Sequence, residues 1–301
     1  MQDAPTFRSP LARFSRIIAV FSLQLVVAAI VLHRLLSLPT PVALSIFLMA
    51  LVGAAIAVLL ALASFVAIWR DGRLGALSAT AGLVVGLGLL AWPAGLIPIS
   101  RSMPAIHDIT TDTAAPPSFV ALAARRTGLA NGAGYGGAEV AKLQLAAYPD
   151  VRPVIVPRSV ADTWDVLGDT VRRLHWQIAS ETPPTAGQPG YIEAVDRTLI
   201  LGFYDDIVVR VLGDARETRI DVRSASRYGK HDFGRNAKRI TSLFNELKLR
   251  LEETLTGTDG RRRRGRRDKA VPRRGKGDPV AHQSRTTSQA RARRGSRREP
   301  R

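Results

Sequence analysis

The chain of 301 residues has no cysteine, and it has far fewer acidic than basic residues. The absence of cysteine excludes disulfides, thiolate catalysis and cysteine-ligated zinc sites. Acidic residues number 25 against 43 Lys and Arg, so the formal net charge is +18. Residues 257–301 hold 17 of the Lys and Arg but only 4 Asp and Glu, a net of +13. Residues 1–256 therefore carry only +5, and the high isoelectric point describes the tail rather than a folded domain.

Charge is almost absent from residues 1–100, which excludes a simple soluble enzyme. Val42–Trp69 and Leu74–Ile99 contain no charged residue, and about 20 apolar residues suffice to cross a bilayer as a helix. A third stretch, Ile17–Leu38, is interrupted near its end by His33 and Arg34. A long arginine side chain near a helix end can reach the headgroups. The sequence therefore predicts three transmembrane helices.

The orientation of these helices follows from the basic residues in the short loops, since Lys and Arg are enriched on the cytoplasmic side. Five arginines lie before the first helix or in the loop between the second and third helices. Two lie on the opposite side, near the end of the first helix and just after the third. This count predicts a cytoplasmic N-terminus, with residue 101 onward on the far side of the membrane. The five are Arg8, Arg13, Arg16, Arg70 and Arg73, and the two are Arg34 and Arg101.

Small residues recur at helical spacing within the predicted membrane helices. Gly82 and Gly86 form a G-x-x-x-G pattern, and Ala50 and Ala54 give the second helix a similar surface. Such residues let helix backbones approach closely. We interpret them as packing surfaces within one three-helix bundle.

Residues 101–256 have the patterns of an α+β domain. Ser159 and Asp162 form a capping pair before one amphipathic helix, and Asp232 is a good cap for a second. Five segments between the helices read as strands, and we expect a two-layer fold of antiparallel sheet and helices. The expected strands are Trp176–Glu181, Tyr191–Val195, Thr198–Phe203, Ile207–Leu212 and Thr218–Ser224.

The last expected strand alternates between apolar and charged residues, which is typical of a sheet with one solvated face. Ile220 and Val222 are expected to face the core, whereas Arg219, Asp221 and Arg223 are expected to face outward.

Several blocks of this region, in order, are similar to one bacterial family, domain-of-unknown-function family fourteen-ninety-nine. The resemblance covers about residues 102–255, and it implies a membrane-anchored or exported domain. It implies no chemistry, because the family's function is unassigned. With the predicted orientation, it places the domain in the periplasm of a bacterium with its helices in the inner membrane. The blocks are Pro104–Asp112, Tyr148–Asp150, Ile192–Ala194, Gly202–Asp206, Asp221–Arg227 and Asp232–Gly234.

Two acidic groups are candidates for chemistry. His107, Asp108 and Asp112 carry metal-ligand side chains, but no second nearby histidine supports a metal site, and turn or capping roles are favoured. Asp205 and Asp206 could form a paired-carboxylate acid/base site. Cross-strand ion pairs with Arg223 and Arg227 are the favoured interpretation.

A basic cluster precedes the last expected helix. Basic side chains beside the free N–H groups of a helix start can bind an anion or a lipid headgroup, although Asp232 as the cap would occupy those donors. We assign no catalytic residue, metal or cofactor. The cluster consists of Arg223, Ser224, Ser226, Arg227 and Lys230.

The basic tail, residues 257–301, has almost no large apolar residues and is predicted to be disordered. On the periplasmic side, its partners would be anionic lipids or envelope polymers. Nucleic acid is disfavoured as a partner, since no aromatic stacking residues are interleaved with the arginines.

Taken together, these patterns predict an inner-membrane protein with a non-enzymatic periplasmic domain that binds or scaffolds within the envelope, in contact with the bilayer and with other membrane proteins. Two alternatives stay open. One is a membrane-bound hydrolase or isomerase that uses the paired carboxylates. The other inverts the topology and makes the tail a cytoplasmic nucleic-acid-binding arm.

Overall fold

The computed structural model describes the backbone of residues 7–270 and the side chains of residues 7–254. The chain divides into two compact units after Thr254. Helix α6 (Arg235–Ala270) continues past residue 256, where the sequence predicts that the tail begins. Residues 271–301 and the side chains of residues 255–270 lie outside the described part of the chain. The disorder predicted for 271–301 and the binding partners predicted for the tail therefore stay predictions.

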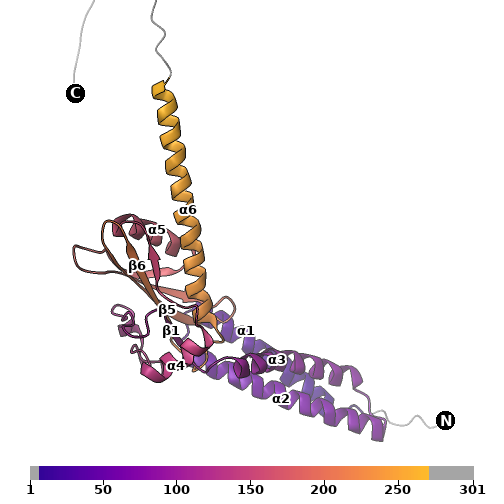
Figure 1. Cartoon of the computed structure of the whole chain (residues 1–301). Coiled ribbons are helices and arrows are strands. Elements are labelled where there is room, and N and C mark those ends of the chain that lie inside the picture. Colours follow the sequence, from indigo (N-terminus) through magenta and orange to yellow (C-terminus); the bar gives the residue numbers. More distant parts are fainter. Residues whose placement is uncertain (1–6, 271–301) are drawn as a thin grey trace, which may run out of the picture. The chain divides into compact units, whose positions relative to one another are not determined.

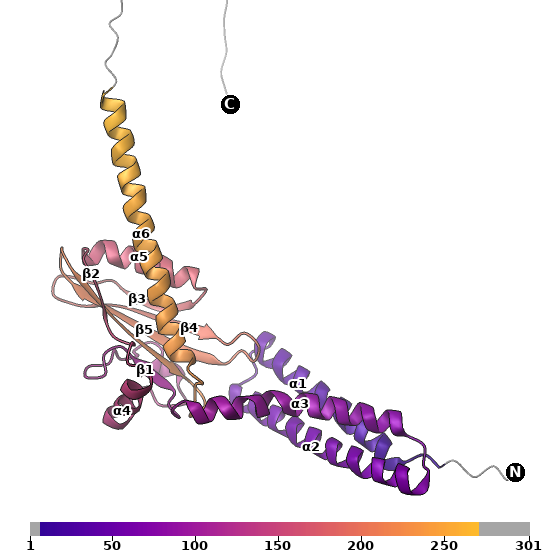
Figure 2. The ribbon, with the colours of Figure 1, turned by 45° about the vertical axis from the view of Figure 1, so that its right-hand side comes forward.

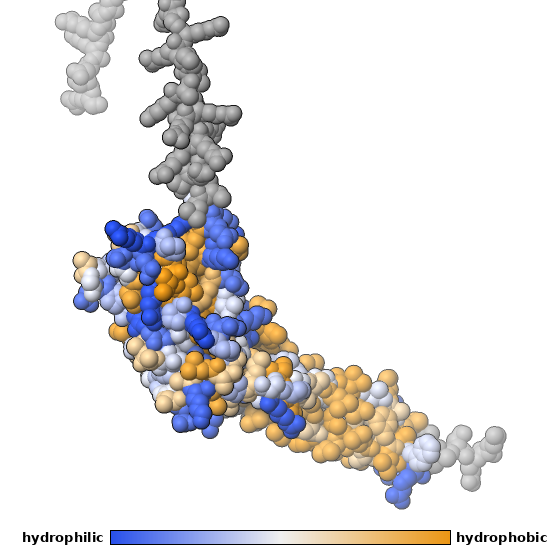
Figure 3. All heavy atoms as spheres, in the orientation of Figure 1, coloured by the Kyte–Doolittle hydropathy of each residue, from blue (hydrophilic) through white to orange (hydrophobic). Residues whose placement is uncertain are grey.

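Three helices at the start of the chain are long and apolar enough to cross a membrane, as predicted. They are α1 (Pro10–Leu35), α2 (Thr40–Asp71) and α3 (Ala76–Ser102), drawn in indigo and purple in Figure 1. The Ser9 hydroxyl caps α1, and α2 ends at Gly72 in a left-handed conformation with φ 64°. Apolar residues cover most of the visible surface of this region (Figure 3). The chain is therefore a membrane protein.

Small residues hold the three helices together, as predicted for intramolecular packing. Ala50 and Ala54 of α2 are fully buried, and the Ser15 hydroxyl of α1 donates to the Ala57 carbonyl at 2.8 Å. A Cβ added at Gly82 would collide with Ser15. The Gly82 and Gly86 pattern is therefore occupied by contacts within the chain, since small residues allow this close approach.

The globular part contains one antiparallel sheet in the order β1-β6-β5-β4-β3, and β2 also pairs with β6. The predicted strand Thr198–Phe203 is wrong, because these residues form the turn between β4 and β5. Gly202 has φ 74°, and its N–H donates to the Thr198 carbonyl. The strands are β1 (Asp108–Thr110), β2 (Val154–Val156), β3 (Gln177–Thr182), β4 (Gly190–Arg197), β5 (Tyr204–Gly213) and β6 (Thr218–Ser226).

Helices α5 (Val160–Arg173) and α6 cover one face of the sheet (Figure 2). The Ser159 hydroxyl accepts a hydrogen bond from the Asp162 N–H, so the predicted cap of α5 is confirmed. The apolar stripes of both helices pack against inward-facing strand residues. We call this the helix-side core; its fully buried members include Leu167, Val171, Ile207, Ile220, Val222, Leu243 and Leu247.

The other face of the sheet is covered rather than solvated. The connection from Thr111 to Gly136, including the short 3-10 helix η1 (Ala123–Arg125), lies on it, and α4 (Gly137–Ala147) follows. This layer forms a second cluster, the loop-side core, made of Phe119, Leu122, Val195, Val208 and Ala225.

The covering layer corrects the expectation for β6. Asp221 and Arg223 were expected to face solvent, but they are buried, while the Arg219 side chain stays 40% exposed. Strand alternation separates the two faces of a sheet, but it does not reveal that a loop covers the second face.

Candidate functional site

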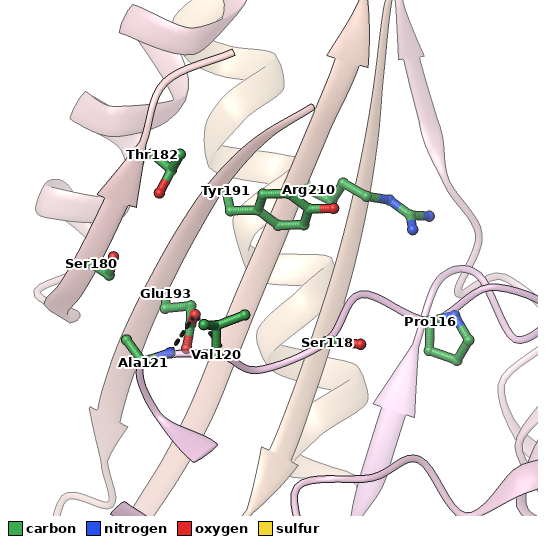
Figure 4. Close-up of a pocket in the computed structure, with 9 residues that line it drawn as sticks. All are labelled: Pro116, Ser118, Val120, Ala121, Ser180, Thr182, Tyr191, Glu193 and Arg210. Carbon is green, nitrogen blue, oxygen red and sulfur yellow. Dashed lines mark hydrogen bonds between the residues drawn. The ribbon is translucent and has the colours of Figure 1, made fainter. Parts of the chain in front are cut away.

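A groove lies where the covering loop meets strands β3, β4 and β5 (Figure 4), with a volume of about 370 Å³. Thr182 on β3 and Arg210 on β5 both pair with Tyr191 on β4, so the three form one row across the sheet. Ser180 pairs with Glu193 in a second row. Hydroxyl groups dominate the polar lining. The lining residues are Pro116, Ser118, Val120, Ala121, Ser180, Thr182, Tyr191, Glu193 and Arg210.

The Glu193 carboxylate fixes the loop that forms the rim of the groove. It accepts hydrogen bonds from the N–H groups of Val120 and Ala121 at 2.9 Å and of Leu122 at 2.8 Å. Such charge-assisted bonds are stronger than neutral ones. Glu193 is therefore a structural acceptor whose oxygens are already engaged.

Arg210 belongs to a four-residue charge cluster at the end of the groove. Its Nη2 lies 3.0 Å from Asp112 Oδ2 and 2.8 Å from Asp221 Oδ2, and Arg219 Nη2 pairs with both acids. Burial raises the pKa of Asp112, but the Ala115 N–H and the charges of Arg219 and Arg210 outweigh it and hold the pKa below its usual value. The two positive and two negative charges cancel, so the cluster has no net charge.

Arg223 of β6 and Asp108 of β1 form a buried bidentate ion pair beneath the covering loop. The nitrogen–oxygen distances are 3.0 and 2.7 Å, and both side chains are almost fully buried. The rings of Phe119 and Tyr135 lie 4.7 and 5.7 Å from the guanidinium carbon, in the range of cation–π contacts. Burial raises the pKa of Tyr135 to about 12, and Asp108 adds to this shift.

The weak metal-ligand candidates His107, Asp108 and Asp112 do not converge on one point. Asp108 pairs with Arg223, whereas Asp112 pairs with Arg210 and Arg219. Burial lowers the pKa of His107, although Asp108 opposes the shift. In the part of the chain that the structure describes, no group of three or more His, Asp or Glu side chains is placed to hold a metal ion.

Asp205 and Asp206 point to opposite faces of β5, as successive strand residues must. Asp206 Oδ1 lies 2.6 Å from Arg227 Nη2, so this cross-strand pair forms as the sequence favours, and its Oδ2 lies 2.9 Å from Arg126 Nε. Asp205 pairs with Arg239 of α6 at 2.6 Å. Arg223 does not join them. Two carboxylates on opposite faces cannot act on one substrate as a pair.

The predicted basic cluster is likewise divided. The Ser224 hydroxyl donates to Asn236 Oδ1 at 2.8 Å, and Ser226 Oγ accepts from Asn236 Nδ2 at 3.1 Å. Arg223 and Arg227 are engaged with Asp108 and Asp206 as described above. Lys230 is exposed.

The helix start beside the basic cluster is also occupied. The Asp232 carboxylate accepts from the N–H groups of Gly234 and Asn236, so the cap uses donors that an anion would need. The five residues therefore do not form one open pocket.

The groove residues Tyr191, Glu193 and Arg210 were not singled out from the sequence. The alternation of the strands could have identified them. Their side chains point to the sheet face opposite to that of their neighbours Ile192, Val209 and Val211, which belong to the helix-side core.

Comparison with known families agrees with the resemblance seen in the sequence. Residues 108–247 match the family described as protein of unknown function, DUF1499. Among curated proteins, none matches the chain significantly. The family match begins with β1 and ends within α6, so it includes the six strands of the described sheet, α5 and the first part of α6. The globular domain of this chain therefore belongs to the DUF1499 family.

Proposed function

We propose that this chain is a multi-pass protein of the bacterial inner membrane whose DUF1499 domain lies in the periplasm and binds a neutral, hydroxyl-rich ligand of the cell envelope. The observation that carries the proposal is the groove of Figure 4. Its volume lies within the range of about 300–1,000 Å³ that is usual for ligand sites. A sugar unit of an envelope polymer has matching chemistry.

The charges around the groove favour a neutral ligand over an anion. Arg210 is the lining cation, and it already contacts two carboxylates, Asp112 and Asp221. Buried charges that are paired with one another offer little further attraction to a charged ligand. Hydroxyl groups, in contrast, can both donate and accept hydrogen bonds. These hydroxyls belong to Ser118, Ser180, Thr182 and Tyr191.

The same lining supports binding rather than catalysis. No histidine lines the groove, and the Glu193 carboxylate already accepts three N–H groups. A general base must reach the proton that it abstracts, and Glu193 is turned to the loop backbone. Asp205 and Asp206, the carboxylates of the hydrolase alternative, are each held by arginines outside this groove.

Titration of the full chain in lipid nanodiscs with the neutral sugar tetra-N-acetylchitotetraose tests this function by calorimetry. We expect saturable binding that weakens about tenfold or more, equivalent to about 1.4 kcal/mol, in Thr182→Trp, which fills the groove. Thr241→Trp, at an exposed position on α6, is the matched control and should bind like the parent. Absence of binding by the parent contradicts the ligand class, and unchanged affinity in Thr182→Trp contradicts the groove.

The proposed orientation rests on the five-to-two excess of arginines at one side of the helices. Alkaline phosphatase fused after Arg101 is expected to be active, and the same enzyme fused at Gly72 inactive. Green fluorescent protein fused at the two positions should give the opposite pattern. Inactive phosphatase after Arg101 would overturn the periplasmic placement and favour the alternative of a cytoplasmic nucleic-acid-binding tail. In the proposed orientation, the tail contacts anionic lipids or envelope polymers.

A further inference from the structure

The turn between β4 and β5, residues 198–203, carries large apolar side chains at its exposed tip. Leu199 is 80% exposed and Ile200 is 61% exposed. Gly, Asn, Asp, Ser and Pro are the usual turn residues. Adjacent exposed Leu and Ile side chains indicate a surface that another apolar phase covers.

Two arginines fix this turn to the end of α1. Arg34 Nη1 donates to the carbonyl oxygen of Thr198 at 3.1 Å and also to that of Leu199. Arg197 Nη2 donates in the other direction, to the carbonyl oxygen of His33 at 3.3 Å. The Arg34 side chain was predicted to reach the lipid headgroups. In the structure it binds the turn instead, and together with Arg197 it links α1 to the turn.

The apolar surface of the turn continues that of the membrane helices. Leu201 and Phe203 line a narrow crevice together with Ile30 of α1 and Phe47 of α2. The Phe203 ring lies 6.0 Å from the His33 ring. Leu35, the last residue of α1, and Leu36, which follows it, are 73% and 70% exposed. The tip therefore borders side chains that are themselves at the membrane.

The backbone at the base of the turn is satisfied without water. The Thr198 N–H donates to the Phe203 carbonyl and the Gly202 N–H to the Thr198 carbonyl. The Phe203 N–H donates to the Thr198 hydroxyl at 2.9 Å. Arg34 supplies donors to two carbonyls, as described above. Among the described residues, the N–H groups of Leu199, Ile200 and Leu201 have no hydrogen-bond partner. Insertion would therefore bring the apolar side chains of the tip to the acyl chains and leave these N–H groups at the hydrated headgroup level.

We propose that the 198–203 turn inserts Leu199 and Ile200 into the bilayer, in the leaflet where α1 ends and α2 begins. Lipid is the partner because the tip adjoins the lipid-facing ends of these helices. The turn would then hold the sheet of the DUF1499 domain against the membrane surface. This inference is independent of the ligand proposed for the groove.

The absence of cysteine from the chain makes a direct test available. The full chain carrying Ile200→Cys is labelled with the environment-sensitive dye NBD and reconstituted into phosphatidylcholine vesicles. Arg216→Cys, in the exposed turn between β5 and β6, is the matched control. For position 200 we expect blue-shifted emission, quenching by nitroxide groups on the lipid acyl chains, and little quenching by aqueous iodide. The control should show the reverse.

The outcomes separate lipid from the other occupants of the tip. Iodide quenching at position 200 as strong as at position 216 would overturn the proposal, because the tip would be in water. Blue-shifted emission without nitroxide quenching would also overturn it, because a protein surface or a second copy of the chain would then cover the tip. Thermal unfolding of the unlabelled Ile200→Cys protein should match that of the parent, since Ile200 is largely exposed.

Discussion

Replacing Arg223 by methionine is expected to destabilise the globular domain by about 3–5 kcal/mol, because it leaves a buried carboxylate without its counter-charge. Asp108 is only 4% exposed and receives both of its arginine contacts from Arg223. The guanidinium also donates to the carbonyl oxygens of Pro117 at 3.1 Å and Ala133 at 2.8 Å. These carbonyls lie on the two ends of the loop that covers the sheet, so the loop should detach with the ion pair.

Urea unfolding of the full chain in detergent micelles, followed by tryptophan fluorescence, measures this effect. Arg219→Met is the matched control, because Arg219 is 40% exposed and shares its two carboxylates with Arg210. Its loss should cost less than about 1 kcal/mol. Combining Arg223→Met with Asp108→Leu should recover much of the stability, since an apolar pair can replace a buried ion pair. Equal losses for the two arginine variants would mean that Arg223 is no more important than a surface charge.

The buried ion pairs mark the limit of what the sequence could predict. The three membrane helices and the stripes of α5 and α6 depend on local periodicity, and these predictions are confirmed. The partners that hold the covering loop are distant along the chain. Arg223 is 115 positions from Asp108, and Glu193 is 73 from Val120. No local pattern pairs such residues, and the groove beside the covering loop could not be located from the sequence.

The turn at residues 198–203 shows a second kind of limit. A short run of Leu, Ile and Phe is typical of a buried strand, and the sequence analysis assigned it so. The same composition suits an apolar turn beside membrane helices, and the contact of Arg34 with Thr198, 164 positions away, distinguishes the two. The hydropathy of a segment indicates that its side chains are removed from water, but it does not distinguish a protein core from a lipid environment.

Truncating Leu247 to alanine is expected to destabilise the domain by about 2–5 kcal/mol, the usual cost for a buried leucine. Leu247 is 2% exposed and belongs to the helix-side core, where α6 packs on the sheet. The lost apolar contacts and the resulting cavity both contribute to the cost. Because an α-helix has about 3.6 residues per turn, residues two positions apart on α6 point in nearly opposite directions.

Leu249→Ala is the matched control for this truncation, since Leu249 lies on the same helix but is 56% exposed. Its effect should stay below about 0.5 kcal/mol. Both variants remove the same atoms and have the same change in helix propensity, so the difference between their unfolding free energies isolates burial. The measurement is the same urea unfolding of the full chain in micelles. Similar losses for the two variants would mean that α6 does not pack through the face assigned to it.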